Sequence, residues 1–411
     1  MLTRDGGGAC LAPPRIMKRS APFACLLLSA SLATAALPAL KVRPQVIDAQ
    51  IKIGYGLAVA DVDGDGRSDI LLADARQIVW YRAPTWEKFV MAENLTEKDN
   101  VCIAARDLDG DGKAEVAVGA EWNPNDTLKS GAVFLLEAPA DRTQRWTPRR
   151  LPHDPTTHRM HWVRTGSGWV LAVLPLHGRG NRNGEGDGVR VLGYEWPWRA
   201  TSIPVPIVSD LPPLHLTHNF ELLPAPAGQT VESLLIAAKE GVLAVDAPVN
   251  RSSPQRVTAP PAGEVRKGAL PDGARFIATI EPLHGNQVVV YRGAAPQFST
   301  GADWTSSRLV VDESLNQGHG LAAADLLGVG YDQVVAGWRG TRPGDRVGIR
   351  LYAPVDPAGR DWRLHSLVDD NTMACEDLKV ADLDGDGRPE VIAAGRASRN
   401  VVIYWNETPK S

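Results

Sequence analysis

The feature that most constrains the fold is a sevenfold repetition of a unit made of short apolar segments. The third segments of the units are the easiest to recognise, and they read QIVWYRAP, GAVFLLEAP, VRVLGYEWP, GVLAVDAP, NQVVVYRGA, GIRLYAP and VVIYWNE. A fourth, alternating polar and apolar segment opens on a tryptophan in five places: Trp86, Trp146, Trp198, Trp304 and Trp362. Aligned on the ends of their first segments, the units recur every 46 to 60 residues.

Four-stranded units of this length, repeated around a chain, predict a β-propeller in which each unit forms one blade. The last unit stops after its third strand, whereas residues 41–49 have an outer-strand pattern and precede the first unit. We therefore expect an all-β fold, a seven-bladed β-propeller over residues 41–411, with an N-terminal strand that closes the last blade. Such closure removes an open sheet edge and favours a single domain.

The N-terminal region has the pattern of an export signal. Met17-Lys18-Arg19 precedes the apolar run from Ala21 to Ala33, and the small residues up to Ala35 suit a cleavage site. We expect residues 1–35 to be a signal peptide with an over-called N-terminal extension, and the mature protein to be exported, either periplasmic or extracellular. The apolar run is shorter than the roughly 20 residues of a membrane helix, so no membrane span is expected.

Composition excludes several classes of partner. The formal net charge is -4 and both signs of charge are mixed along the chain, so we expect no nucleic acid partner. Beyond the signal segment, two cysteines remain, Cys102 and Cys375. An exported protein with so few cysteines has no disulfide framework, and we expect a monomer.

Three units carry the same acidic loop between the first and second strands: DVDGDGRSD at 61–69, DLDGDGKAE at 107–115 and DLDGDGRPE at 382–390. An EF-hand needs a glutamate at loop position 12 and flanking helices, but that position holds Leu72, Val118 or Ala393. The spacing fits a β-hairpin calcium loop, with carboxylates at positions 1, 3, 5 and 9 and a backbone carbonyl at position 7.

The predicted Ca²⁺ ligands are Asp61, Asp63, Asp65, Arg67, Asp69, Asp107, Asp109, Asp111, Lys113, Glu115, Asp382, Asp384, Asp386, Arg388 and Glu390. The alternative is a solvated acidic turn without metal. A decayed copy at 325–333 has Leu327 and Val329 at carboxylate positions, so we expect no ion there.

A second set of residues lies at the other end of the first strands. Six positions before the alignment points, the units have Tyr55, Val101, His158, His218, Glu264, His319 and Glu376. Six strand residues span roughly 20 Å, so this ring is expected on the axis, at the face opposite the acidic loops. The loops between second and third strands open on the same face and bring His177, His284 and several cationic residues.

Imidazole and carboxylate groups at one axial mouth suit a borderline divalent metal such as Zn²⁺ or Mn²⁺. The predicted catalytic residues are His158, His218, His319, Glu376 and His284. The predicted substrate-binding residues are His177, Lys239, Glu264, Arg266, Arg339, Arg396 and Trp338. For each residue taken singly, the alternative is a structural hydrogen bond or ion pair between blades.

The acidic loops resemble those of the FG-GAP or VCBS repeats in integrin-type propellers, where calcium pins a hairpin within a blade. The segments LTHNF, EPLHGNQ, QGHGLAAADL, VAGWR and MACEDLKVADLDGDG also resemble the propeller domain of the aldos-2-ulose dehydratases, which remove water from oxidised sugars. The resemblance implies a calcium-stabilised lyase or dehydratase that acts on a carbohydrate or keto-sugar by proton abstraction and β-elimination.

Two other functions stay open, because propellers support both catalysis and binding. One is a non-catalytic module that binds a carbohydrate or a protein. The other is a metal-dependent polysaccharide lyase that performs the same elimination on a uronate. The histidine ring favours an enzyme, since a binding face seldom needs several imidazoles at its axis.

Overall fold

The computed structural model describes residues 37–182, 184–199, 203–207, 214–225, 228–245, 255–293 and 304–409. The predicted signal peptide, residues 1–35, lies outside the described residues. In the described part of the chain, the helical structure is one 3-10 turn, η1 (Thr305–Ser307). No helix found there is long and apolar enough to cross a membrane.

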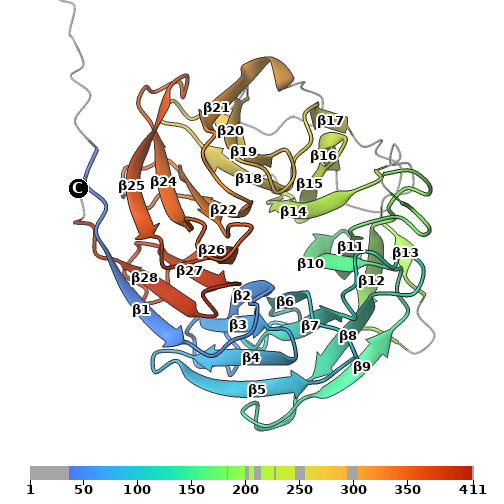
Figure 1. The fold of residues 1–411 in the computed structure, drawn as a ribbon. Helices are drawn as coiled ribbons and strands as arrows, with labels where there is room; N and C mark the ends of the chain where they lie inside the picture. Colours follow the sequence, from blue (N-terminus) through green and yellow to red (C-terminus); the bar gives the residue numbers. More distant parts are fainter. Residues whose placement is uncertain are drawn as a thin grey trace, which may run out of the picture. The chain divides into compact units, whose positions relative to one another are not determined.

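The strands form seven sheets of four strands each, and neighbouring strands within a sheet run antiparallel (Figure 1). The first three blades consist of β2 (Gly56–Ala60), β3 (Asp69–Ala73), β4 (Gln77–Arg82) and β5 (Glu87–Glu93); β6 (Cys102–Arg106), β7 (Glu115–Ala120), β8 (Ala132–Glu137) and β9 (Thr147–Leu151); and β10 (Thr157–Thr165), β11 (Gly168–Pro175), β12 (Leu192–Trp196) and β13 (Val205–Pro206).

The next three blades consist of β14 (Thr217–Leu223), β15 (Ser233–Ala238), β16 (Gly241–Val245) and β17 (Gln255–Thr258); β18 (Glu264–Ala269), β19 (Arg275–Glu281), β20 (Gln287–Arg292) and β21 (Arg308–Asp312); and β22 (Gly318–Ala324), β23 (Gln333–Trp338), β24 (Gly348–Pro354) and β25 (Trp362–Asp370). Each of these blades is a meander of strands consecutive in the sequence.

The seventh blade joins both ends of the propeller. It contains β26 (Cys375–Ala381), β27 (Glu390–Gly395), β28 (Val401–Asn406) and β1 (Val42–Asp48). β1 pairs antiparallel with β28, from Val42 opposite Asn406 to Asp48 opposite Val401. The seven-bladed propeller and the closing N-terminal strand are therefore confirmed.

The first strand of each blade lies nearest the axis, beside the first strands of both neighbouring blades (Figure 1). Because these strands belong to different sheets, side chains supply the polar links between them. The Asp377 carboxylate accepts the Leu57 N–H at 2.7 Å, and the Lys267 ammonium donates to the Leu222 carbonyl at 3.0 Å. The inner wall of the propeller is thus held by polar contacts as well as by packing.

Apolar side chains fill the space between blades. Strands such as β3 and β23 are buried along their whole length, which explains why the sequence shows continuous apolar runs in the middle strands. Cys102 and Cys375 are buried with free thiols.

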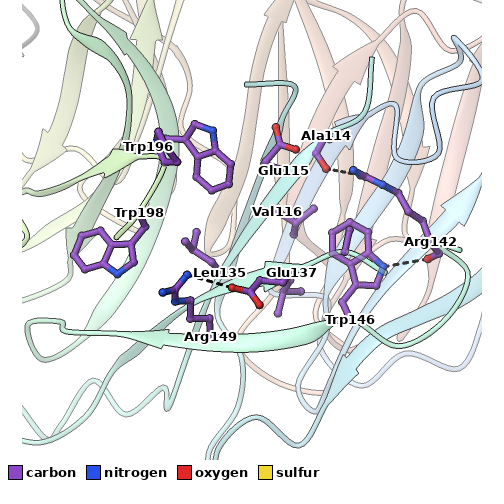
Figure 2. A pocket seen from close by; sticks show the side chains of 13 residues that line it. Ala114, Glu115, Val116, Leu135, Glu137, Arg142, Trp146, Arg149, Trp196 and Trp198 are labelled. Carbon is purple, nitrogen blue, oxygen red and sulfur yellow. Dashed lines mark hydrogen bonds and ion pairs between the residues drawn. The ribbon is translucent and has the colours of Figure 1, made fainter. Parts of the chain in front are cut away.

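A cavity of about 370 Å³ lies between the second and third blades, bordered by Trp146, Trp196 and Trp198 (Figure 2). Arg142 at its edge donates to the carbonyls of Val62 at 3.0 Å and Ala114 at 2.8 Å. This guanidinium ties the first acidic loop to the second. None of the ring histidines lines this cavity.

Candidate functional site

Four members of the predicted ring are the extra residues of β-bulges. At the start of four innermost strands, the pairing with the second strand skips one residue, and the skipped residues are His158 in β10, His218 in β14, His319 in β22 and Glu376 in β26. In blade 5 the register runs without a shift, and Glu264 lies opposite Ile280. A bulge re-aims a side chain at a local cost in ladder hydrogen bonds, and bulges are frequent beside active sites.

Three imidazoles from consecutive blades meet at the axis. His218 comes from β14, His284 from the loop between β19 and β20, and His319 from β22. Each offers a ring nitrogen, and these nitrogens lie within 4.8 Å of one another. The rings of His218 and His284 are perpendicular with centroids 4.2 Å apart, and those of His284 and His319 stack at 4.6 Å. This is the separation at which three nitrogens can share one ion.

Backbone carbonyls orient two of these rings. Nδ1 of His218 is 2.9 Å from the Gly263 carbonyl oxygen, and Nδ1 of His319 is 2.5 Å from the Glu376 carbonyl oxygen. A carbonyl accepts hydrogen bonds only, so Nδ1 carries the proton in both rings and Nε2 is left with a lone pair. Such carbonyl partners are the usual means of fixing a metal-binding imidazole.

A fourth imidazole, His158, lies next to the cluster. Its ring centroid is 4.7 Å from that of His218, and it stacks on the half-buried Trp122 at 4.9 Å. Nε2 of His158 is 3.2 Å from the Arg159 guanidinium. A guanidinium only donates, so Nε2 accepts and Nδ1 of the neutral ring carries the proton. This buried N–H has no hydrogen-bond partner among the described residues, so it is free for an acceptor on a ligand.

Burial keeps all four imidazoles neutral. It lowers the pKa of His218 to about 3 and that of His284 to about 2, with nearby cationic or imidazole groups adding to the effect. Burial and Arg159 hold the pKa of His158 well below its usual value, and burial and Arg339 do the same for His319. Neutral rings can act as metal ligands or as proton acceptors.

Two guanidinium groups hold the Glu376 carboxylate beside the cluster. Arg339 donates to Oε2 at 2.6 Å, and Arg396 donates to both carboxylate oxygens at 2.7 and 2.8 Å. Burial raises the pKa of Glu376, but the hydrogen bonds and charges of Arg396 and Arg339 outweigh it, so the pKa lies below its usual value. The structure therefore places Glu376 in an ion-pair network, outside the group of three clustered imidazoles.

Glu264 lies against the other side of the histidine cluster. Its carboxylate accepts from Asn219 at 2.6 Å, and it lies 3.2 Å from Nδ1 of His218 and 3.4 Å from Arg266. Burial raises the pKa of Glu264 although Arg266 opposes the shift. A second cavity, of about 120 Å³, continues along the inner strands and is lined by Arg159, Asn219, Arg266 and Asp377 among others.

The remaining predicted contacts fall into separate places. His177 is half-buried, with Nδ1 3.4 Å from the His215 carbonyl, and Lys239 is exposed. The prediction of Trp338 as a substrate surface is wrong, because its side chain is 3% exposed. Its indole donates to the Arg346 carbonyl at 2.8 Å, and Arg350 covers its ring. Trp122, beside His158, is the indole at the mouth.

The acidic loops bring carboxylates together at the opposite ends of the inner strands. The clusters contain loop positions 1, 3 and 9: Asp61, Asp63 and Asp69; Asp107, Asp109 and Glu115; and Asp382, Asp384 and Glu390. Within each cluster the oxygens lie within 4.8 Å of one another. Burial, with like charge nearby, raises the pKa of the position-9 carboxyl to about 7 in all three loops.

The position-5 carboxylates have another partner. Asp65, Asp111 and Asp386 each accept the backbone N–H of position 7, at 2.9, 2.8 and 2.8 Å. These contacts are local turns of the kind aspartate favours. Position-7 carbonyls belong to Arg67, Lys113 and Arg388.

Oxygen-rich clusters of this kind fit a hard cation. In the first loop, Oδ1 of Asp63 is buried and lacks a hydrogen-bond partner among the described residues. Carboxylate oxygens are the donors Ca²⁺ prefers, and a buried unpaired carboxylate oxygen is costly without one.

The loop of blade 6 keeps the turn and the carboxylate of position 1, but it lacks the carboxylates of positions 3, 5 and 9. Asp325 accepts the N–H groups of Val329 and Gly330 at 2.9 and 2.6 Å. At position 9, Gln333 accepts the Leu327 N–H at 2.9 Å and donates its amide to the Tyr331 carbonyl, at position 7, at 2.6 Å. The amide of Gln333 thus occupies the role that a cation would have in the other loops.

Comparisons with known proteins agree with this architecture. An FG-GAP-like repeat matches residues 56–118, and an FG-GAP repeat matches residues 103–136. Together these matches run from residue 56 to residue 136, over the first blade and the inner strands of the second, with both acidic loops. The protein is a β-propeller that contains FG-GAP repeats, and this confirms the first resemblance seen in the sequence.

A curated relative narrows the comparison. The chain is 25% identical to the aldos-2-ulose dehydratase of Phanerodontia chrysosporium over 338 residues, which is 74% of this chain and 36% of that protein. The chain thus spans about a third of the relative's length. This distant similarity extends across most of the propeller.

Solved structures share the fold at low sequence identity. A chain of the mitotic checkpoint complex aligns with a TM-score of 0.53 and 14% identity, covering 95% of this chain and all of its own length. A chain from BBS1N in complex with ARL6DN aligns with a TM-score of 0.52 and 11% identity, covering 92% of this chain and 99% of its own. At these identities the likeness shows the propeller fold alone.

Proposed function

We propose that the axial histidine cluster is the active site of a carbon–oxygen lyase that removes water from a keto-sugar. The observation that carries the proposal is the convergence of His218, His284 and His319 from three blades. Packing alone does not account for it, because the same position in other blades holds Tyr55 or Val101. The distant similarity to a dehydratase supports the same reaction class.

The donor set fits a borderline divalent metal such as Zn²⁺ or Mn²⁺, held by the three neutral imidazoles. When bound, such a metal stabilises negative charge that develops on a carbonyl oxygen of the substrate. The carbonyls of Gly263 and Glu376 keep the rings of His218 and His319 aimed at the axis.

The chain's own residues supply the proton transfers. His158 lies outside the cluster of three, and its Nε2 holds the lone pair because the Arg159 guanidinium can only donate to it. This nitrogen is placed to accept the proton next to the substrate carbonyl once the substrate takes the place of the Arg159 contact. Arg339 and Arg396 reach the same mouth through Glu376 and can stabilise the enolate oxygen or the departing hydroxyl. Trp122 beside His158 offers an apolar face for a sugar ring.

Calcium in the three acidic loops and export of the mature chain are parts of this proposal. The carboxylate clusters lie at the ends of the inner strands remote from the histidines, so their ions would stiffen blades 1, 2 and 7 without taking part in the reaction. A purely binding propeller is the second candidate, and the distant relationship to the dehydratase does not exclude it.

The test compares His319→Ala with His365→Ala, a histidine of outer strand β25 whose Nε2 contacts the Pro38 carbonyl. Metal content and turnover of a keto-sugar, followed by absorbance of the unsaturated product, are measured for both. We expect His319→Ala to lose the transition metal and roughly 100-fold or more in turnover, with unfolding free energy lowered by about 1–3 kcal/mol. The His365→Ala variant should keep both. Full turnover by the metal-depleted His319→Ala variant would show that the histidine cluster is not the active site.

A further inference from the structure

Two arginines lie together at the mouth around the histidine cluster. Arg339 and Arg396 both bind Glu376, so two guanidiniums share one carboxylate. Glu376 is 2% exposed, and the Arg339 side chain is 13% exposed. An excess positive charge held in a partly buried site is unfavourable unless an anion accompanies it.

Arg159 is a third guanidinium near the cluster. It donates to the His158 carbonyl at 3.0 Å and lies 3.2 Å from Nε2 of the same residue. Its charge opposes the rise in the pKa of Glu264 and helps to lower the pKa of Asp377, so it has anionic neighbours. Bound to a metal, the imidazoles are neutral ligands, so the ion itself would add positive charge to the mouth.

The two guanidiniums also have donors to spare. An arginine carries five N–H groups in a planar fork. Three N–H···O bonds go to Glu376, and two longer contacts, at 3.4 and 3.2 Å, join Arg339 to the neutral Gln317 side chain. Gln317 is half-buried at the surface of the mouth, so an incoming anion can displace this weak partner.

We propose that the sugar bound at this mouth is acidic, with a carboxylate held by Arg339 and Arg396 next to the carbon that loses its proton. Planar guanidiniums match the two oxygens of a carboxylate, which distinguishes this ligand from a neutral sugar. The inference rests on the carbon–oxygen lyase activity proposed above, but it takes a sugar acid in place of the neutral keto-sugar.

The elimination balances without an oxidant or reductant. The C–H bond next to the carboxylate breaks, and its proton passes to Nε2 of His158, the ring nitrogen that holds the lone pair. The electron pair of that bond forms a carbon–carbon double bond, while the C–O bond at the neighbouring carbon breaks. The leaving oxygen takes a proton from the His158 imidazolium and departs as water or as a sugar hydroxyl.

The experiment measures binding to the metal-loaded full chain by calorimetry, which needs no turnover. The probes are glucuronate, glucose and acetate, each with the unaltered protein, Arg396→Gln and Arg339→Gln. Each variant leaves Glu376 paired with the other arginine. The matched control is Arg346→Gln, which removes an exposed arginine paired with Asp370 at 2.6 Å in the loop that follows Arg339.

We expect glucuronate to bind, glucose to bind at least tenfold more weakly, and both site variants to lose roughly tenfold or more in glucuronate affinity. The control should bind like the unaltered protein, and glucuronate affinity should fall with added salt. Equal affinity for glucose and glucuronate, or no loss in either variant, would overturn the proposal. Acetate binding as tightly as glucuronate would reduce the site to an anion site and overturn its sugar specificity. If a neutral keto-sugar is turned over while glucuronate does not bind, the lyase stands and this inference falls.

Discussion

The blade 6 loop predicts the outcome of one substitution in the acidic loops, Glu390→Gln. Gln333 shows that an amide at position 9 can hold the turn by accepting the N–H of position 3 and donating to the carbonyl of position 7. In blade 7, Glu390 accepts instead the N–H of position 2, Leu383, at 2.8 Å. The variant keeps that acceptor and gains a donor that can reach the Arg388 carbonyl.

Without metal, the substitution should stabilise the protein. The carboxylates of Asp382, Asp384 and Glu390 lie within 4.8 Å of one another. At that distance, with the dielectric of water, two like charges repel by about 1 kcal/mol, so removing one member relieves two pairs and about 2 kcal/mol. The measurement is made at pH 8, because the pKa of Glu390 is raised to about 7 by burial and the neighbouring carboxylates.

With calcium, the order should reverse. An ion present at a hundred times its dissociation constant stabilises the folded state by about 2.7 kcal/mol per site. The unaltered protein gains this amount in blade 7, and Glu390→Gln loses most of it. The variant should therefore unfold at higher urea than the unaltered protein in chelator, and at lower urea in calcium, as followed by tryptophan fluorescence.

The control is Glu407→Gln, which removes an exposed glutamate paired with Arg43 in the same blade. Its stability should follow that of the unaltered protein in both conditions. If Glu390→Gln is less stable than the unaltered protein even in chelator, repulsion between the three carboxylates does not destabilise the metal-free loop. If calcium raises the stability of both proteins equally, Glu390 is not a ligand.

Two further predictions concern the fold. Removal of residues 42–48 exposes the edge of β28, to which β1 is paired. The truncated protein should lose its cooperative unfolding and should aggregate, which light scattering measures. A monomeric, cooperatively folded product would show that closure by β1 does not stabilise the propeller. Burial lowers the pKa of His161 to about 3. As pH falls below about 6.5, the unfolded chain therefore binds a proton before the folded protein does. The free energy of unfolding should then decrease by up to about 1.4 kcal/mol per pH unit. His161→Gln should flatten that part of the pH profile in urea titrations, and an unchanged slope would refute the assignment.

The sequence predicts the fold in detail because two separate features of its repeats indicate the same propeller. Each blade shows the apolar middle strands, and the short N-terminal segment has an outer-strand pattern that only the incomplete last blade can use. Closure of the circle then places equivalent residues at equivalent heights, which is why His158, His218 and His319 could be assigned to one ring. His284 was placed at the same mouth from its loop, although it lies outside the ring alignment.

The sequence could not predict which side chains at the mouth are hydrogen-bonded to one another and which are free to bind a ligand. Glu376 and the clustered imidazoles are both typical metal ligands, and only the positions of Arg339 and Arg396 show that the carboxylate is already paired. Trp338 has the composition of a sugar-stacking residue, yet the packing of Arg350 on its ring encloses it. In both cases the deciding contacts come from residues so far away along the chain that no local sequence pattern indicates them.

The bulges and the acidic clusters are distributed differently over the blades. A packing requirement would be common to all seven inner strands, whereas the register skips a residue in blades 3, 4, 6 and 7 and runs regularly from Glu264 in blade 5. Acidic clusters occur instead in blades 1, 2 and 7. The two features therefore vary independently, and blade 6 combines a bulged histidine with a loop held by Gln333. A blade can lose its carboxylates and keep its axial residue, which is the behaviour expected if the loops brace the scaffold and the bulges build the site.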